Sequence, residues 1–472
     1  MLQGHSSFQL LQKSILSGKI SVTDIVRHYL SQIEKTNHLN QYLEVYPAEA
    51  LSKANELDQK ISANQAVGKL AGMVISHKDI ISYKDHALTA SSNILKGYKA
   101  KYTATVLQRL LDEDAIIIGR VNCDEFAMGS SNENSAFGAV LNPLDPSRIP
   151  GGSSGASATS VASDTCWASI GTDTGGSVRQ PAAFCGIVGF KPSYGRISRH
   201  GLIAYGSSFD QAGFLSQSVS DAALLLNITQ GIDAYDASMN PDVLPEINLS
   251  TDKPSSIAYL DIEHFKDAVD PVIYTNYYET VESWKQKGYL LHSVKLDWLD
   301  YVIPAYYVMT TAEASSNLSR FDGIRYGHRN TEAKTIDQVY KKSRTEGFGK
   351  EVKRRILLGT YVLSAGFYDA YYTKAQKVRR LVKNHLDRLF KDHEALILPI
   401  SPVMPWKIGT KMDDPVSVYL ADIFTVMANV AGIPGVSIPS GRDENGLPIG
   451  IQIVSRAWNE QTLLSLADQL SH

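Results

Sequence analysis

The chain has 472 residues, with 46 basic and 49 acidic side chains and a formal net charge of −3. Apolar residues make up 43% of it and charged residues 20%, which is ordinary for a globular protein. The near balance of charge argues against a globally basic nucleic-acid binder. Three cysteines without a C-x-x-C pair argue against a disulfide scaffold or a zinc knuckle and favour a reducing compartment.

No apolar run approaches the roughly 20 residues that a membrane-spanning helix needs. The N-terminus lacks the basic start and apolar stretch of a secretion signal. Residues 1–23 carry no acidic side chain, as in organellar transit peptides, but helical periodicity begins early and leaves little room for a removable leader. We therefore expect a cytoplasmic protein that does not bind a membrane.

Helices and short apolar strands are predicted to alternate from the N-terminus onwards. Ser21 begins a capping-box pattern, and apolar residues then recur at helical spacing over 25–33. Met73–Ile75 predicts a buried strand, residues 106–111 predict a helix, and Ile116–Ile118 predicts a second strand. This alternation is typical of an α/β fold with a mainly covered sheet.

The segment 120–215 is rich in Gly, Ser, Ala and Asn and has little periodicity, which inside a compact domain is typical of a functional region. After it, a long helix is predicted over 367–393. Five further strands are predicted at Ile257–Leu260, Leu290–Leu296, Leu396–Leu398, Val436–Ile438 and Ile449–Val454. No repeat and no Pro- or Ser-rich linker divides the chain, so we predict one domain over residues 1–472, with the stretch 300–375 as a cap over the site.

Two glycine-flanked serines, Ser153 and Ser177, lie in one segment of small residues between Pro150 and Pro192. Small residues let the backbone approach a ligand closely, and glycine permits the dihedral angles that aim several N–H groups at one point. A serine in such a loop is a candidate nucleophile that faces its own oxyanion hole.

Three interpretations of this segment compete. Gly151–Gly155 fits the G-x-S-x-G elbow of α/β-hydrolases, but residues 142–150 carry three prolines where that fold requires a strand. A phosphate-binding loop is weaker still, because no lysine follows Gly175-Gly176. The third interpretation joins the serines to Lys78, since burial can lower the pKa of a lysine until it serves as a base. On its own, Lys78 fits equally the solvated surface charge that most lysines are.

Three separate motifs together resemble the amidase signature family. They are Lys78-Asp79, G-G-S-S-G at 151–155, and G-T-D-T-G-G-S-V-R-Q-P-A-A-F-C-G-I-V-G-F-K-P at 171–192. The resemblance covers about residues 20–460 and implies an α/β/α domain whose mixed central sheet is covered by helices. It places a catalytic signature core over about 70–215 and a substrate-cap and glutamine-recognition region over about 300–430. Departures at Met73, Ser76-His77 and Ala156 remove no catalytic atom.

The resemblance also implies roles for individual residues. Ser177 would be the acyl-forming nucleophile, Ser153 the relay that follows a cis peptide bond, and Lys78 the general base. The oxyanion hole would be formed by the backbone N–H groups of Thr174, Gly175 and Gly176. Asp173 and Arg179 are expected to brace this loop rather than take part in the chemistry.

Further motifs narrow the resemblance to the glutamine-hydrolysing members of the family. They lie at 124–134, 194–199, 207–211 and 313–318. By this resemblance Arg355 would bind the α-carboxylate of glutamine, for which a guanidinium offers two hydrogen bonds in a fork. Asp422 would bind the α-ammonium group, and Tyr306 or Tyr307 would line the pocket. No metal ligands are expected.

The resemblance implies a glutaminase that passes ammonia to a partner. The partners would be the two companion subunits, of types B and C, of a heterotrimeric amidotransferase that converts Glu-tRNA(Gln) to Gln-tRNA(Gln). ATP and Mg²⁺ would bind to the partner, and this chain, which has no nucleotide-binding loop, would need no cofactor. Two alternatives are a stand-alone amide hydrolase and a non-catalytic scaffold. A third is direct tRNA binding through Lys341, Lys342, Arg344, Lys350, Lys353 and Arg354.

Overall fold

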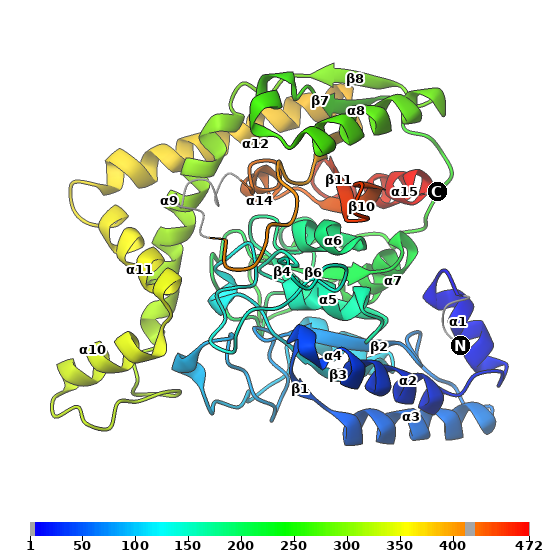
Figure 1. The fold of residues 1–472 in the computed structure, drawn as a ribbon, viewed down its shortest axis with the longest axis horizontal. Coiled ribbons are helices and arrows are strands. Elements are labelled where there is room, and N and C mark those ends of the chain that lie inside the picture. Colours follow the sequence, from blue (N-terminus) through cyan, green and yellow to red (C-terminus); the bar gives the residue numbers. More distant parts are fainter. Residues whose placement is uncertain (1–4, 411–420, 472) are drawn as a thin grey trace.

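One mixed sheet forms the centre of the computed structural model, which describes residues 5–410 and 421–471. Its strands are β1 (Tyr42–Val45), β2 (Val74–Lys78), β3 (Ile116–Val121), β4 (Ala168–Asp173), β5 (Val188–Lys191), β6 (Gln211–Ser216), β7 (Ile257–Leu260), β8 (Leu291–Val294), β9 (Ala395–Pro399), β10 (Gly435–Arg442) and β11 (Pro448–Ser455). Their order across the sheet is β1-β3-β2-β4-β6-β5-β10-β11-β9-β7-β8 (Figure 1). Strand β2 is parallel to β3 and β4, and β7 is parallel to β8 and β9, whereas the other pairs are antiparallel.

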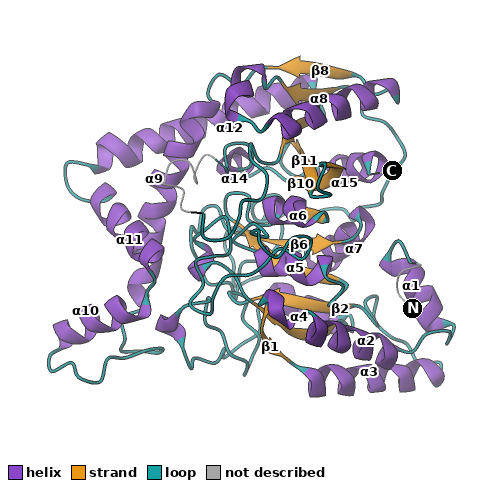
Figure 2. Ribbon diagram, viewed as in Figure 1, coloured by secondary structure: helices purple, strands orange, loops and turns teal. Residues whose placement is uncertain are grey.

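Helices surround this sheet (Figure 2). They are α1 (Phe8–Leu16), α2 (Val22–Lys35), α3 (Pro47–Ser62), α4 (Thr105–Asp112), α5 (Gly155–Ala162), α6 (Arg179–Cys185), α7 (Val219–Thr229), α8 (Pro271–Gln286), α9 (Leu299–Asn317), α10 (Ile336–Gly347), α11 (Lys350–Val362), α12 (Lys374–Asp392), α14 (Val426–Ala431) and α15 (Glu460–Leu470). The predicted α/β fold is confirmed. That residues 1–472 form one domain stays a prediction, and 1–4, 411–420 and 472 lie outside the described residues.

The strands predicted from apolar runs are confirmed, with small shifts of their ends. Every residue of β2 and of β3 is buried, so both faces of these central strands are covered and their sequence reads as a continuous apolar run. The predicted cap of α2 is also present, because Ser21 Oγ accepts a hydrogen bond from the backbone N–H of Asp24 at 3.0 Å.

The segment 120–215 contains more regular structure than its periodicity indicates. Strands β4, β5 and β6 and helices α5 and α6 all lie in it, at the middle of the sheet. Nearly all of their residues are buried, and most are small, so no polar face alternates with an apolar one. The elements that carry the serines are therefore those that periodicity cannot reveal.

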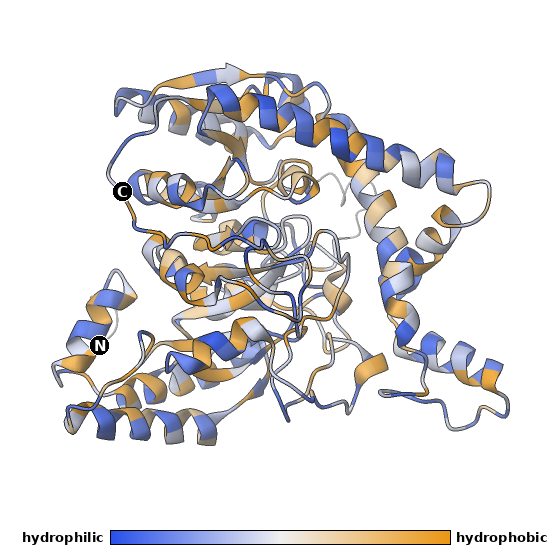
Figure 3. Ribbon diagram, turned by 180° about the vertical axis from the view of Figure 1, so that it is seen from behind, coloured by the Kyte–Doolittle hydropathy of each residue, from blue (hydrophilic) through white to orange (hydrophobic). Residues whose placement is uncertain are grey.

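The helix predicted over 367–393 begins differently. A π-helical stretch, Tyr368–Thr373, comes first, and α12 follows it. The stretch has no buried residue, whereas α12 buries an apolar stripe that includes Val382 and Leu386. Hydrophilic and hydrophobic residues alternate along the outer helices (Figure 3). No helix in the described part of the chain combines the length and apolarity that crossing a membrane requires.

The region 300–375 forms helices beside the sheet rather than part of it. Helices α9 and α11 pack against each other along one side of the molecule, with α10 at the far end of this arm (Figure 1). A methyl group on Gly175, in the loop after β4, would lie 2.6 Å from Tyr306 Oη of α9. Helix α9 therefore contacts the loop that precedes Ser177.

Candidate active site

Lys78 lies at the carboxyl end of β2, and its side chain is fully buried. Its Nζ lies 2.7 Å from Ser153 Oγ, 2.9 Å from Ser154 Oγ and 3.1 Å from Thr172 Oγ1. Ser154 donates its own hydroxyl hydrogen to the carbonyl of Thr172 at 3.1 Å, so it can only accept from the amine. Three hydroxyl groups, and no carboxylate of the described residues, thus surround this lysine.

These surroundings favour the neutral amine. Burial lowers the pKa of Lys78 to about 8, against the opposing attraction of nearby carboxylates such as Asp124 and Asp173. A neutral amine has two N–H donors and one lone pair. Donation to Ser154 and Thr172 would leave the lone pair for the hydroxyl hydrogen of Ser153. The geometry therefore suits proton transfer from Ser153 to Lys78.

The two glycine-flanked serines differ in their access to solvent. Ser153 follows a cis peptide bond after Gly152 and is fully buried, whereas Ser177 is 9% exposed. The N–H of Ser154 donates to the carbonyl of Ser177 at 3.1 Å, which joins their two loops. The Ser177 hydroxyl itself forms no hydrogen bond within the described residues, so its path to Ser153 is open here. Only Ser177 is placed to meet an external substrate.

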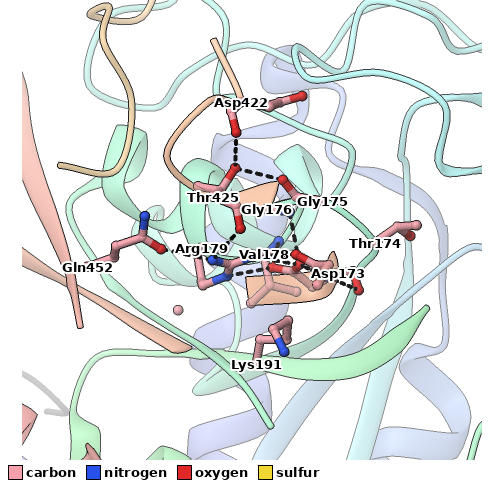
Figure 4. Close-up of polar contacts among 12 residues, drawn as sticks. Asp173, Thr174, Gly175, Gly176, Val178, Arg179, Lys191, Asp422, Thr425 and Gln452 are labelled. Carbon is pink, nitrogen blue, oxygen red and sulfur yellow. Dashed lines mark hydrogen bonds and ion pairs between the residues drawn. The ribbon is translucent and has the colours of Figure 1, made fainter. Parts of the chain in front are cut away.

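The fully buried carboxylate of Asp173 fixes the loop after β4 (Figure 4). It accepts the backbone N–H of Gly176 at 2.9 Å and that of Val178 at 3.1 Å. Arg179 donates to it from Nε and Nη2, both at 3.1 Å, and Asn429 from Nδ2 at 2.9 Å. Burial alone would raise the pKa of Asp173, but the charge of Arg179 holds that pKa well below its usual range. Asp173 and Arg179 thus brace the loop, as predicted.

The backbone N–H groups near Ser177 are not equivalent. That of Gly176, one of the three predicted oxyanion donors, is already bonded to Asp173. Those of Thr174 and Gly175, and also that of Ser177, donate to no residue in the described part of the chain. Unpaired N–H groups are rare inside proteins. Three of them beside an accessible hydroxyl provide donors for an oxygen atom of a ligand.

Close contacts explain the two glycines of this loop. Thr425 donates from Oγ1 to the carbonyl of Gly175 at 2.6 Å (Figure 4). Gly176 has a φ of +126°, which side chains rarely permit, and a methyl group there would overlap Thr425. With Tyr306 against Gly175, both glycines are needed for packing, and Gly176 is also needed for its backbone angle.

Arg179 connects this loop to the other half of the sheet. Its Nη1 donates to the carbonyl of Thr425 at 3.1 Å and to Gln452 Oε1 at 2.8 Å, and its Nη2 donates to Asn429 Oδ1 at 2.7 Å. Gln452 belongs to β11. Sequence analysis assigned no role to Thr425, Asn429 or Gln452, because they lie about 250 positions or more from the loop and carry no motif of their own.

The predicted glutamine-recognition residues lie together. Asp422 Oδ2 accepts a hydrogen bond from Ser130 at 2.8 Å and one from Tyr307 at 3.5 Å. The guanidinium of Arg355 lies 5.3 Å from the ring centre of Tyr307, and its Nη1 donates to the Tyr205 hydroxyl at 2.7 Å. One cation and one carboxylate thus flank the same aromatic ring. Ser130 and Tyr205 are additions that the sequence analysis did not assign to the pocket.

The charge of Asp422 is sensitive to this environment. Burial raises its pKa to about 7, although the hydrogen bond from Ser130 and the charge of Arg355 act in the opposite direction. Tyr306 differs from Tyr307, because it packs edge-on against Phe209 and contacts Gly175. The residues just before Asp422, 411–420, lie outside the described residues.

The basic residues considered for direct tRNA binding are mostly engaged within the chain. Lys341 pairs with Asp337 at 2.9 Å, Arg354 pairs with Glu351 at 2.7 Å, and Arg344 donates to two backbone carbonyls. Three of the six groups are thus paired or bound to carbonyls, which weakens the case for a dedicated phosphate-binding surface.

Metal-assisted chemistry has no obvious location in the described residues. They contain no group of three or more His, Cys, Asp or Glu side chains that could hold a metal ion. The three cysteines are buried and unpaired with one another. The groups gathered around Ser177 are therefore an amine, hydroxyls and backbone N–H donors.

Comparison with known proteins agrees with this geometry. The model of the Amidase family matches residues 24–464, and the chain belongs to that family. The glutamyl-tRNA(Gln) amidotransferase A subunit of Chlorobium phaeobacteroides (strain BS1) is 50% identical over 98% of both chains. That of Clostridium botulinum (strain Kyoto / Type A2) is 48% identical over 96% of this chain and 94% of its own. The solved structure of the same subunit from Thermotoga maritima is 35% identical and matches 94% of this chain and 90% of its own, with a TM-score of 0.76.

We expect Gly176→Ala to destabilise the protein by more than about 2 kcal/mol, because it combines an unfavourable φ with overlap of Thr425. Gly446→Ala is the matched control, since Gly446 also has a positive φ, +83°, but nothing lies within 4 Å of the added methyl group. Chemical unfolding of both variants measures the difference. Equal losses of stability would show that contact with Thr425 does not constrain the loop.

Proposed function

We propose that this chain is the glutaminase subunit of a glutamyl-tRNA(Gln) amidotransferase. The observation that carries the proposal is the buried Lys78 amine bonded to Ser153, beside the accessible Ser177. Relatives at about half identity over nearly the whole chain, which are named as the A subunit of this amidotransferase, support the choice of substrate.

The first half-reaction forms an ester on Ser177. Neutral Lys78 accepts the hydroxyl proton of Ser153, which in turn takes the proton of Ser177 as that oxygen attacks the carboxamide carbon of glutamine. The C–N bond of the tetrahedral intermediate then breaks. Ammonia leaves with the proton returned through Ser153, and a glutamyl ester remains on Ser177.

Backbone donors stabilise the charge that develops in this step. The N–H groups of Thr174, Gly175 and Ser177 have no partner in the described residues, whereas that of Gly176 serves Asp173. We therefore assign the oxyanion mainly to the first three, a shift of one donor from the set that the sequence predicted. One such donor contributes about 2.7–4 kcal/mol in a transition state.

The second half-reaction releases glutamate. Water attacks the ester carbon, loses its proton through Ser153 to Lys78, and the returning proton regenerates the Ser177 hydroxyl. Arg355 binds the α-carboxylate of glutamine during both steps, and ionised Asp422 binds the α-ammonium group. Tyr307 forms the wall between these charges, and Tyr306 holds the loop before Ser177.

The ammonia is used elsewhere in an assembly. By the name of its relatives, the chain acts with companion subunits of types B and C, and with Glu-tRNA(Gln) as the acceptor. ATP and Mg²⁺ belong to a partner subunit, because the sequence of this chain has no nucleotide-binding loop. The chain itself requires no cofactor, since its acid–base chemistry needs only the lysine and two serines.

We expect Ser177→Ala to lower the glutaminase rate by a factor on the order of 10³ or more, because it removes the attacking atom. Ser153→Ala and Lys78→Met should lose comparable activity, since the three groups act as one unit. Ser157→Ala is the matched control, a buried serine of α5 whose hydroxyl has no partner in the described residues. Near-normal release of ammonia by the Ser177 variant would contradict the mechanism.

We expect the kcat for glutamine to rise with pH and to level off above about 8, because only neutral Lys78 accepts a proton and its pKa is about 8. KM should fall as the pH rises through about 7, where Asp422 ionises and attracts the ammonium group. Steady-state rates from about pH 6 to about pH 9.5 test both limbs, since this range spans the two pKa values. Lys78→Arg, which stays protonated, should be inactive throughout, and an active Lys78→Arg enzyme would refute the assignment.

We expect the tagged chain, purified from its native cell, to carry two companion proteins and to support ATP-dependent formation of Gln-tRNA(Gln) from glutamine. A stand-alone amide hydrolase would instead purify alone and hydrolyse varied amides. Purification and a tRNA amidation assay with glutamine or ammonium chloride separate these functions. The Ser177→Ala assembly should still use ammonium chloride, because only the ammonia supply is lost.

A further inference from the structure

Glu125 lies in a turn between the serine loops and the α11 helix, and it is 4% exposed. Its carboxylate accepts hydrogen bonds from the Ser92 hydroxyl and from the backbone N–H of Gly349, at 2.8 Å to Oε2. It forms no ion pair with any described residue. Burial raises its pKa to about 7, although these hydrogen bonds act in the opposite direction. A buried carboxylate with only these partners needs a specific reason to be there.

Gly349 is the residue that caps the N-terminus of α11, and no side chain of the helix itself caps this end. The first N–H groups of a helix lack partners within it, and a negative charge placed there is stabilising. Glu125 supplies such a charge from another part of the chain. A methyl group on Gly349 would overlap Glu125 Oε2, so the contact is as close as a glycine allows.

The same helix carries Arg355. Farther along α11, Gly359 packs so closely on the backbone carbonyl of Thr311 in α9 that a methyl group would overlap it. Helix α11 is therefore fixed at two places, by Glu125 at its N-terminal cap and by α9 at Gly359. Arg355 lies between them, so both contacts determine where its guanidinium stands relative to Asp422.

The turn that holds Glu125 also supports the Ser153 loop. The neighbouring Asp124 accepts backbone N–H groups from Asn132 and Asn134 at 2.9 and 3.1 Å, and its carboxylate packs directly against Gly152. Phe126, the next residue, has a φ of +52°, unusual for an aromatic residue, and packs on Phe348 just before α11. Backbone in this region is retained where the surrounding contacts impose it.

We propose that Glu125 is a positioning residue for glutamine recognition, which sets α11 and thereby Arg355 at a fixed place relative to the serine loop beside Asp124. The inference rests on the proposed binding of the glutamine α-carboxylate by Arg355. Two adjacent acidic residues thus link the two halves of the site: Asp124 contacts the loop of the relay serine, and Glu125 contacts the helix of the substrate-binding arginine.

The test compares Glu125→Gln with the wild-type assembly on two amides. Glutamine carries the α-carboxylate, and 4-aminobutanamide lacks it but keeps the amine and the carboxamide. We expect KM for glutamine to rise about tenfold with kcat changed less than about twofold, because a hydrogen bond to a charged group is worth about 1.5–3 kcal/mol. The kcat/KM for 4-aminobutanamide should not change, since it makes no use of Arg355.

Glu394→Gln is the matched control. Glu394 likewise accepts from a serine hydroxyl and a backbone N–H, both of Ser255, but lies far from the site in sequence and caps no helix that carries a site residue. Gly349→Ala tests the contact from the opposite side, because the added methyl group displaces the carboxylate. It should give the same selective rise in KM, and it serves if Glu125→Gln does not fold.

Three results would overturn the inference. An unchanged KM for glutamine in both variants would show that Arg355 does not depend on this contact. An equal loss of kcat/KM for the two amides would show a general structural role instead. Failure of the wild-type assembly to hydrolyse glutamine at all would overturn the proposed function and this inference with it.

Discussion

The burial of one lysine amine without a counter-ion is the constraint on which the site depends. A charged ammonium group in the interior is unfavourable unless a carboxylate pairs with it, and Lys78 has only hydroxyl neighbours among the described residues. The fold therefore maintains an amine ready to accept a proton near neutral pH. Ser154 and Thr172 do not react, but by accepting the amine hydrogens they direct its lone pair towards Ser153.

The neighbouring Asp173 and Arg179 show the opposite solution to the same problem. Both are fully buried, yet they pair with each other, and every side-chain oxygen of Asp173 is hydrogen-bonded. Breaking such a pair by removing one partner costs about 3–5 kcal/mol, so the pair makes a rigid support. The site combines an unpaired base, which must change charge, with a paired brace, which must not.

Much of this site could be predicted from the sequence, because its chemistry lies in short motifs. Lys78 follows an apolar strand, and the glycines around Ser153 and Ser177 indicate close backbone approach. The fold class and most strands outside 120–215 follow from apolar runs. Strands β4 to β6 could not be predicted in the same way, since burial on both faces and small side chains remove the alternation that marks a strand.

The rest depends on contacts that a linear pattern does not contain. No motif indicates that Gly176 donates its N–H to Asp173, which changes the set of available oxyanion donors. Nor does the sequence show that Thr425, Asn429 and Gln452 reach the loop from the C-terminal part of the chain, or that Glu125 meets the N-terminal cap of α11. These are tertiary contacts between segments whose local sequences give no sign of them.

The support given by the C-terminal residues has a consequence for how the protein is made. Synthesis begins at the N-terminus, so Lys78, Ser153 and Ser177 leave the ribosome well before Thr425, Asn429 and Gln452. Until those later residues arrive, Arg179 lacks three of its acceptors and the loop before Ser177 lacks its outer wall. A nascent chain thus holds all the reactive groups but not their arrangement, and amide cleavage is postponed until translation is nearly complete.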